Sequence, residues 1–349
     1  MFLTSNKGKF THWFWAVPTL LLVLLLANGC TGVPDRNPTA VLELGTYLFS
    51  DPRLSGDGSI SCATCHKSEF GYGDGQDLSE TYPASDGFRN TPTIVHASSS
   101  TSFYADGRLS NSTPSDVIRD MIGGKLFLNV HDVLLTERMK QIPVYDSLFY
   151  AAFGSEPTFD HLVTALEHFQ ASLTPKDSPY ETGMMSASAL RGEALFQGSA
   201  GCASCHSGPT FSDGQAHAIG VPNNASIATD PLRLSALRLF LKEKGVDDFM
   251  TIDSDPGRYV ATGDESDYGA FMTPSLRQVA DTAPYMHNGS LGTLEEVVAF
   301  YSDRGPALSE TEQSDVVEFL KALSGKIPEV FVPEMPDYAV SPNWSEEAN

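Results

Sequence analysis

Basic side chains are scarce in this sequence of 349 residues, in which 22 lysines and arginines stand against 44 aspartates and glutamates. The formal charge of −22 makes binding to nucleic acid or to an anionic membrane unfavourable, because both are themselves negatively charged. The same charge favours attraction of a basic partner such as a small redox protein, and it equally suits plain solubility.

Long apolar runs are also lacking. The run at residues 13–27 is shorter than the roughly 20 residues that a membrane-spanning helix needs. Two lysines precede it, so residues 1–30 are predicted to be an export signal that leaves the mature protein in the periplasm. Leu26–Cys30 resembles a lipoprotein cleavage site, although an asparagine stands where a small residue is usual. Cys30 is then a lipid anchor; ordinary cleavage slightly downstream is the alternative.

Cysteine is sparse as well, which leaves little room for a disulfide framework. Apart from Cys30, the cysteines lie in two pentapeptides of the form Cys-x-x-Cys-His, Cys62–His66 and Cys202–His206. Covalent haem attachment needs this pattern: two thiols bond to one porphyrin, and the histidine binds its iron. A zinc ribbon is disfavoured by the wide separation of the pairs, and a thioredoxin-like motif would not need both histidines. The sequence therefore predicts two haem c groups, attached at Cys62, Cys65, Cys202 and Cys205, with proximal ligands His66 and His206.

Persistent strand-like alternation is absent from the sequence, so the predicted fold class is mainly α. Apolar residues recur at helical spacing in residues 38–49 and 159–173, and residues 309–312 form a capping box before a last helix. Residues 67–89 are rich in Gly, Asp and Ser and indicate a loop around a haem edge. Residues 175–188 are predicted to be a linker.

The chain repeats itself around the two pentapeptides. Leu44–Phe49 precedes the first as Arg191–Phe196 precedes the second. Further matches pair Asp74–Gln76 with Asp213–Gln215, Asn90–Ile94 with Met272–Leu276, Tyr104–Gly107 with Tyr285–Gly289, and Asp116–Met121 with Glu296–Tyr301. These repeats predict two cytochrome c-like helical haem domains related by internal duplication. The predicted order is a tether at 31–37, haem domains at 38–177 and 178–331, and a polar tail at 332–349.

With these motifs, the chain resembles the bacterial di-haem cytochrome c peroxidases and their relative MauG over about residues 38–326. The markers besides the pentapeptides are Arg89–Thr93, Asp106–Arg108, Gly208–Pro209, Thr273–Arg277 and Thr282–Gly289. The resemblance implies that hydrogen peroxide reacts at the first haem, while the second stores and passes electrons from a redox partner. It also implies a calcium ion between the haems, held by the side chain of Asn90 and the backbone carbonyls of Thr282 and Pro284.

The resemblance also implies a distal ligand for the second haem. Tyr301 lies 17 residues after Pro284, where peroxidases have methionine and MauG-like enzymes have tyrosine. An oxygen ligand favours oxidised iron, so Tyr301 predicts a second haem that tolerates high oxidation states. The alternative is that Tyr301 packs in the core while Met286 or Met272 binds the iron.

Near the first haem, the sequence departs from the family. Ala105 stands where the family has a tryptophan between the haems, which leaves Tyr104 or Phe103 as the relay. Residues 67–89 contain no histidine to cap the first iron. In many family members such a histidine leaves the iron only after reduction. Its absence here suggests that the first haem needs no reductive activation, which would make it similar to MauG-like enzymes.

The expected distal glutamine and glutamate are missing too. Their positions hold Ser115 and either Lys125 or Phe127. Asp116 and Asp120 are the nearby carboxylates, although the spacing does not select them. The peroxidase hypothesis is weaker for this reason, because such a carboxylate transfers the proton that splits the O–O bond.

Two functions therefore compete. The leading hypothesis is an exported di-haem oxidoreductase that reduces hydrogen peroxide, with His66 and Tyr104 as catalytic residues, or that oxidises a protein or organic substrate as MauG does. The alternative is a non-catalytic electron-transfer cytochrome whose first iron is capped by Met121, at the position equivalent to Tyr301. His287 is expected to form a structural hydrogen bond between the haems. The remaining histidines are expected to be surface or packing residues: His96, His131, His161, His168 and His217.

Overall fold

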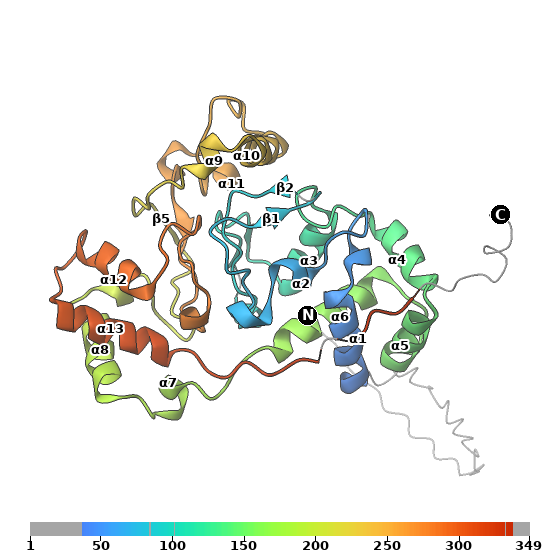
Figure 1. Ribbon diagram of the computed structural model, residues 1–349, viewed down its shortest axis with the longest axis horizontal. Coiled ribbons are helices and arrows are strands. Elements are labelled where there is room, and N and C mark those ends of the chain that lie inside the picture. Colours follow the sequence, from blue (N-terminus) through green and yellow to red (C-terminus); the bar gives the residue numbers. More distant parts are fainter. Residues whose placement is uncertain (1–36, 84, 101, 332, 338–349) are drawn as a thin grey trace, which may run out of the picture. The chain divides into compact units, whose positions relative to one another are not determined.

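The computed structural model describes residues 37–83, 85–100, 102–331 and 333–337. The predicted signal peptide with Cys30, and most of the predicted tether and tail, lie outside the described residues. Helices dominate the described part, and its strands are all two residues long, which confirms the mainly α fold (Figure 1). Within these residues, no helix has the length and apolar character needed to span a membrane.

Two crossing helices form the centre of the first half. α1 (Pro38–Ser50) begins at an Asn37 cap and buries an apolar face against α6 (Phe159–Ser172). Gly45 lies at the crossing, where an added Cβ would overlap the carbonyl oxygen of Ala165. The helices approach this closely because glycine has no side chain. Both helices match those predicted from apolar spacing.

Further helices cover this pair and hold the first pentapeptide. α5 (Pro143–Phe153) packs on α1, and α3 (Pro114–Gly123) packs on α6. α4 (Asp132–Lys140) contacts both α5 and α6. α2 (Cys62–Cys65) contacts α1, so the apolar core around α1 fixes the position of the first pair of cysteines.

A second crossing pair lies in the C-terminal half. α8 (Ala187–Gln197) crosses α13 (Glu310–Ala322), and α12 (Leu294–Ser302) packs on α13. Gly192 stands at this crossing, and a Cβ there would overlap the carbonyl oxygen of Asp315. The rings of Phe196, Phe211 and Phe319 form the core. The predicted capping box before α13 is present.

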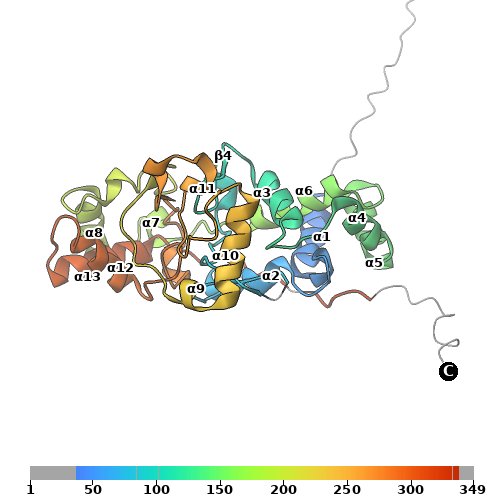
Figure 2. The ribbon, with the colours of Figure 1, turned by 90° about the horizontal axis from the view of Figure 1, so that it is seen from above.

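A third group of helices follows the second pentapeptide: α9 (Ser226–Thr229), α10 (Pro231–Glu243) and α11 (Tyr259–Thr262). α10 lies between the α1–α6 pair and the α8–α13 pair in Figure 2, and above the space between them in Figure 1. Its Phe240 packs on Phe88 of the first half, with ring centroids 5.3 Å apart. The two halves therefore share an apolar contact.

The strands of the described residues form three antiparallel pairs: β1 (Glu80–Thr81) with β2 (Ser85–Asp86), β3 (Ser102–Phe103) with β4 (Leu109–Ser110), and β5 (Ala216–His217) with β6 (Phe271–Met272). The first two pairs are local hairpins, whereas β5 and β6 join segments far apart in the sequence. The predicted loop at 67–89 contains β1, β2 and a 3₁₀ turn. The predicted linker at 175–188 contains α7 (Pro179–Thr182).

Candidate functional site

The first pentapeptide forms one helical turn. The Ser61 N–H donates to the Thr64 hydroxyl at 2.9 Å at its start, and the His66 N–H donates to the Cys62 carbonyl at 2.9 Å at its end. The thiols of Cys62 and Cys65 are free. Two free thiols and an imidazole in one turn are the donor set that haem c requires.

The imidazole of His66 is oriented by the backbone. Its Nδ1 lies 2.9 Å from the carbonyl oxygen of Tyr72, so Nδ1–H donates and Nε2 keeps the lone pair that an iron ligand needs. Burial lowers the pKa of His66, while backbone hydrogen bonds to Tyr72 and Pro92 oppose this shift. The ring is therefore neutral, the form that binds a metal.

The second pentapeptide repeats the hydrogen bonds of the first histidine, although it forms a 3₁₀ turn over Cys202–Ser204. The His206 N–H donates to the Cys202 carbonyl at 2.9 Å, and Nδ1 of the His206 ring lies 3.0 Å from the carbonyl oxygen of Phe211. Burial again lowers the pKa of the histidine, against backbone hydrogen bonds to Phe211 and Pro274. The thiols of Cys202 and Cys205 are free. Both pentapeptides thus fit haem c.

Tyr301 lies on α12 and faces the second pair of cysteines. Its side chain is 39% exposed. Burial of the hydroxyl, followed by the nearby thiols of Cys205 and Cys202, raises the pKa of Tyr301 to about 12. The hydroxyl of Tyr301 and the thiols of Cys202 and Cys205 therefore lie within electrostatic range of one another.

Met272, an alternative ligand, is engaged elsewhere. Its sulfur lies 3.6 Å from Nη1 of Arg258 and packs against Gly107 of the first half. A sulfur held against a guanidinium is a poor iron ligand, which argues for Tyr301 over Met272.

Met121 occupies the place in α3 that Tyr301 occupies in α12. α3 starts with a capping box between Thr113 and Asp116, and α12 starts with one between Thr293 and Glu296. Met121 follows its threonine by eight residues (121 − 113), as Tyr301 does (301 − 293). Met121 and Tyr301 therefore stand at the same position of two helices that begin with the same kind of cap.

Tyr104 is held by charged and aromatic neighbours. Its hydroxyl donates to Oδ2 of Asp120 at 2.7 Å, the guanidinium of Arg108 lies 3.3 Å from the centre of its ring, and the ring stacks on that of Phe127. Burial raises the pKa of Tyr104 well above its usual value, so the phenol is protonated. The sequence spacing did not select Asp120, because the side chain reaches Tyr104 only through the packing of α3. Among the described residues, no hydrogen bond joins Tyr104 or Asp120 to His66.

An ion-pair network joins the two halves beside Tyr104. Arg89 binds Asp106 of the first half at 2.6 Å and Asp255 of the second at 2.5 Å, and Arg108 also binds Asp106 at 2.9 Å. Asp106 is fully buried. Burial alone would raise the pKa of Asp106, but Arg89 and Arg108 outweigh it and lower that pKa. The markers Arg89–Thr93 and Asp106–Arg108 are therefore parts of one buried network.

The structure brings Asn90 to the motif that contains its proposed calcium partners. The Asn90 N–H donates to the carbonyl of His287 at 2.8 Å, within Thr282–Gly289. Its amide Nδ2 donates to the Gln76 carbonyl at 2.8 Å, which turns Oδ1 away from that bond. An amide oxygen with carbonyls of Thr282 and Pro284 is a suitable set of hard ligands for calcium.

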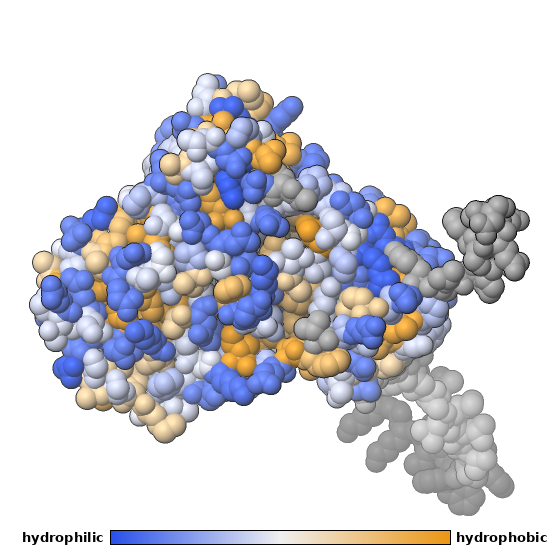
Figure 3. Space-filling model, in the orientation of Figure 1, coloured by the Kyte–Doolittle hydropathy of each residue, from blue (hydrophilic) through white to orange (hydrophobic). Residues whose placement is uncertain are grey.

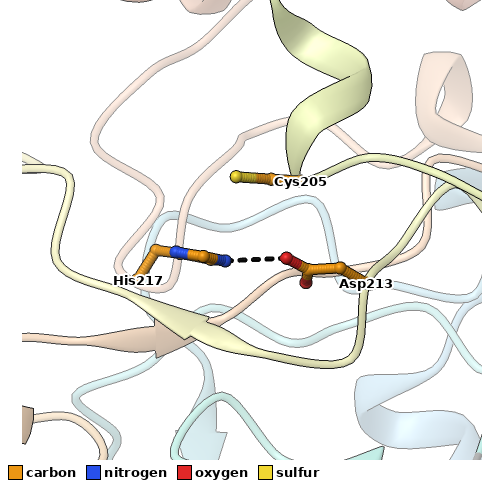
Figure 4. A group of neighbouring side chains, drawn as sticks. All are labelled: Cys205, Asp213 and His217. Atoms are coloured by element: carbon orange, nitrogen blue, oxygen red, sulfur yellow. Dashed lines mark hydrogen bonds and ion pairs between the residues drawn. The ribbon is translucent and has the colours of Figure 1, made fainter.

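Asp213 and His217 lie beside Cys205 (Figure 4). Nε2 of His217 is 2.8 Å from Oδ2 of Asp213, and one donor atom from each of the three residues lies within 4.8 Å of the others. Because Cys205 is predicted to attach the second haem, this pair lies beside the predicted second haem site. His217, predicted to be a surface or packing residue, has a side chain that is 38% exposed and pairs with Asp213. A histidine four residues after an aspartate was the only sequence signal, and it is weak.

Comparison with known proteins identifies the family. A family model described as di-haem cytochrome c peroxidase matches residues 39–189. Cytochrome-c peroxidase IdrP2 from Pseudomonas sp. (strain SCT) is 40% identical, over 86% of this chain and 85% of that protein. The chain belongs to the di-haem cytochrome c peroxidase family.

Other members of the peroxidase family agree. The methylamine utilization protein MauG from Methylorubrum extorquens is 33% identical, over 87% of this chain and 84% of that protein. The crystal structure of a MauG-like protein associated with microbial copper homeostasis has a TM-score of 0.68 at 26% identity, covering 90% of this chain and 96% of that one. Membership in the di-haem peroxidase family confirms the predicted resemblance, the oxidoreductase class and haem c as cofactor.

Proposed function

We propose that this protein is an exported di-haem c-type oxidoreductase that reduces hydrogen peroxide in the manner of a cytochrome c peroxidase. Each peroxide takes two electrons and two protons and gives two molecules of water. The observation that carries the proposal is the matched geometry of His66 and His206, whose Nδ1 atoms lie 2.9 and 3.0 Å from backbone carbonyls. Both leave Nε2 for iron, so one chain holds the two redox centres that a two-electron reduction needs.

Acid–base chemistry at the first haem is assigned to Tyr104 and Asp120. Haem supplies one-electron redox chemistry and the site where the O–O bond breaks. Phe127 fills a position expected for the family's glutamate and stacks on Tyr104. The protonated Tyr104 hydroxyl, 2.7 Å from the Asp120 carboxylate, forms a donor–acceptor pair that can hold and pass a proton.

Tyr301 supports a MauG-like use of the oxidising equivalents. A tyrosine oxygen stabilises oxidised iron, so the second haem would hold an oxidising equivalent for a protein or organic substrate. The lack of a histidine in residues 67–89 supports the same proposal, because the first iron then needs no release by reduction.

Internal duplication is part of the proposal. Gly45 and Gly192 allow equivalent close crossings, α1 with α6 and α8 with α13. Two capping boxes, at the starts of α3 and α12, extend the match. These pairs support haem domains at 38–177 and 178–331.

The proposed setting is the periplasm, with a calcium ion held by Asn90, Thr282 and Pro284 and a lipid anchor at Cys30. The electron donor is proposed to be a small basic redox protein, because the chain carries a charge of −22. The face seen in Figure 3 is mainly hydrophilic, with small separate hydrophobic groups, which suits a partner that binds transiently through charge.

A non-catalytic electron-transfer cytochrome is the second candidate. The observation that favours it is the placement of Met121, which matches Tyr301 along equivalent helices. A thioether on the first iron would fill the position that peroxide needs.

A stoichiometric assay tests the proposal. A reduced basic c-type cytochrome is mixed with the protein carrying both haems, and its oxidation is followed as hydrogen peroxide is added. Two cytochromes oxidised per peroxide support peroxide reduction. No oxidation, with a wholly low-spin ferric protein that Met121→Ala converts to high spin, overturns it in favour of the electron-transfer cytochrome.

A further inference from the structure

Ala105 interrupts the aromatic connection that the family has between its haems. Its methyl group offers no ring where the family has tryptophan. The backbone of Ala105 still contacts the second half, because the Met272 N–H donates to the Ala105 carbonyl at 2.8 Å. Met272 is the last residue of β6, so the two halves meet at β6.

An aromatic pair lies at this meeting point. The ring of Phe271, also in β6, stacks on the imidazole of His287, with centroids 3.6 Å apart and planes inclined by 11°. Burial lowers the pKa of His287 to about 4, so the stacked imidazole is neutral at physiological pH. The backbone carbonyl of His287 accepts the hydrogen bond from the Asn90 N–H, and its ring makes this stack.

From Phe271 the chain leads directly to the second haem. Two residues further on, the Thr273 carbonyl accepts from the Ser212 hydroxyl at 2.7 Å, and the carbonyl oxygen of the neighbouring Phe211 lies 3.0 Å from Nδ1 of His206. Phe271 is also paired with His217 across the β5–β6 ladder, and a ring nitrogen of His217 lies within 4.8 Å of the Cys205 sulfur. The stack is therefore linked both to the proximal ligand and to a thioether of the second haem.

From His287 a hydrogen bond leads towards the first haem. The His287 carbonyl accepts from the Asn90 N–H at 2.8 Å. The next residue, Thr91, donates its hydroxyl to Asp74 at 2.8 Å. Asp74 lies two residues after Tyr72, whose carbonyl oxygen is 2.9 Å from Nδ1 of His66. Covalent bonds, hydrogen bonds and one ring stack thus join the two proximal histidines without an open gap.

We propose that the stacked pair Phe271–His287 is the electron bridge between the two haems, in place of the family's tryptophan. Electron tunnelling weakens steeply across gaps, and close ring contact keeps the path continuous. Neither ring changes its own oxidation state. Each electron given up by the iron at His206 is gained by the iron at His66, and a reduced redox protein replaces it. The physiological purpose of this transfer rests on the proposed function.

Flash reduction tests the bridge without peroxide. A photoreduced flavin gives one electron to the protein carrying both haems, and absorbance follows its movement between them. In Phe271→Leu and His287→Leu, made separately, the transfer rate constant should fall by about tenfold or more, because each change opens a gap of about one van der Waals contact in the path. His287→Phe keeps a ring and should retain the rate. Unchanged transfer in both leucine variants overturns the proposal.

Phe153→Leu is the matched control. It removes another stacked phenylalanine–histidine pair, Phe153 with His161, whose centroids are 4.1 Å apart and which lies off this path. The transfer rate should be unchanged in this variant. Slowed transfer in Phe271→Leu together with no reaction of the wild type with peroxide would keep the bridge and reject the proposed function. Normal peroxide turnover by the wild type, with unchanged transfer in both leucine variants, would keep the proposed function and reject the bridge.

Discussion

The hydroxyl of Tyr104 donates a 2.7 Å hydrogen bond to the carboxylate of Asp120. The two residues are 16 positions apart in the sequence, and the spacing of the family's motifs does not select Asp120 as a partner of Tyr104. Tyr104 is held in the left-handed backbone region, at φ +65°, with Arg108 against its ring. The contact pairs a carboxylate with a protonated hydroxyl beside Phe127, which fills one of the positions expected for the family's glutamate.

Loss of this pair should slow peroxide turnover. Asp120→Asn removes the proton acceptor and Tyr104→Phe removes the donor, so each should lower kcat for peroxide by about a hundredfold, as for a lost general acid–base. Asp160→Asn is the control, since Asp160 pairs with Arg119 on the surface. Turnover equal to that of the wild type in both site variants would remove Tyr104 and Asp120 from the mechanism.

Substitution of Tyr301 should change the second haem. Tyr301→Phe should alter the low-spin ferric absorption and electron paramagnetic resonance signals, because an oxygen ligand is lost. Tyr301→Met should raise the reduction potential, since a thioether favours ferrous iron. Potentiometric titration measures the shift. Altered low-spin signals in Met286→Leu but not in Tyr301→Phe would assign the ligand to Met286 instead.

The close crossing of α8 and α13 at Gly192 should leave no room for a side chain. Gly192→Ala should lower the free energy of unfolding by about 1–3 kcal/mol, because its Cβ would overlap the carbonyl of Asp315. Gly123→Ala is the control: a Cβ there has no neighbour within 4 Å, so alanine should be neutral or slightly stabilising. Thermal or urea unfolding of the protein with both haems measures the two changes. Equal stability of the variants would show that the crossing can relax.

Asp106 should contribute stability that disappears in acid. Its pKa is lowered by Arg89 and Arg108 against the effect of burial, so its stabilisation is present above the unfolded pKa of about 3.9 and is lost as pH falls through the lower folded pKa. At pH 7, Asp106→Asn should cost about 3–5 kcal/mol, because buried guanidinium groups lose their partner. Urea unfolding at several pH values should give a difference that shrinks towards zero in acid. A difference independent of pH would contradict this account.

Chelation should remove the proposed calcium and loosen the region around Asn90. EGTA should lower the melting temperature of the wild type, and added calcium should restore it, because a bound ion stabilises the folded state. Asn90→Leu should make the melting temperature insensitive to both. A wild type that binds no calcium in isothermal titration would reject the site.

The pentapeptides and the long helices could be predicted because their signals are local. The thiol spacing of Cys62 and Cys65 determines the attachment chemistry, and apolar spacing indicates α1 and α6. The capping box at Ser309 shows where α13 begins. For these features, neighbouring residues carry the information.

The contacts around the haems could not be predicted in the same way. Asp120 reaches Tyr104 through the packing of α3, and His217 meets Cys205 because β5 pairs with a strand more than fifty residues away. The Phe271–His287 stack needs the same tertiary arrangement. Such contacts depend on which distant segments pack together, and the local pattern of one sequence does not carry that information.

Rapid mixing of the fully ferric protein with one equivalent of hydrogen peroxide tests the central claim most directly. Absorption and electron paramagnetic resonance spectra are recorded before mixing and through the first seconds. The account predicts a high-spin component at the first haem and a fast spectral change that consumes the peroxide. A wholly low-spin protein, unchanged by peroxide both when ferric and when reduced by one electron, would contradict it.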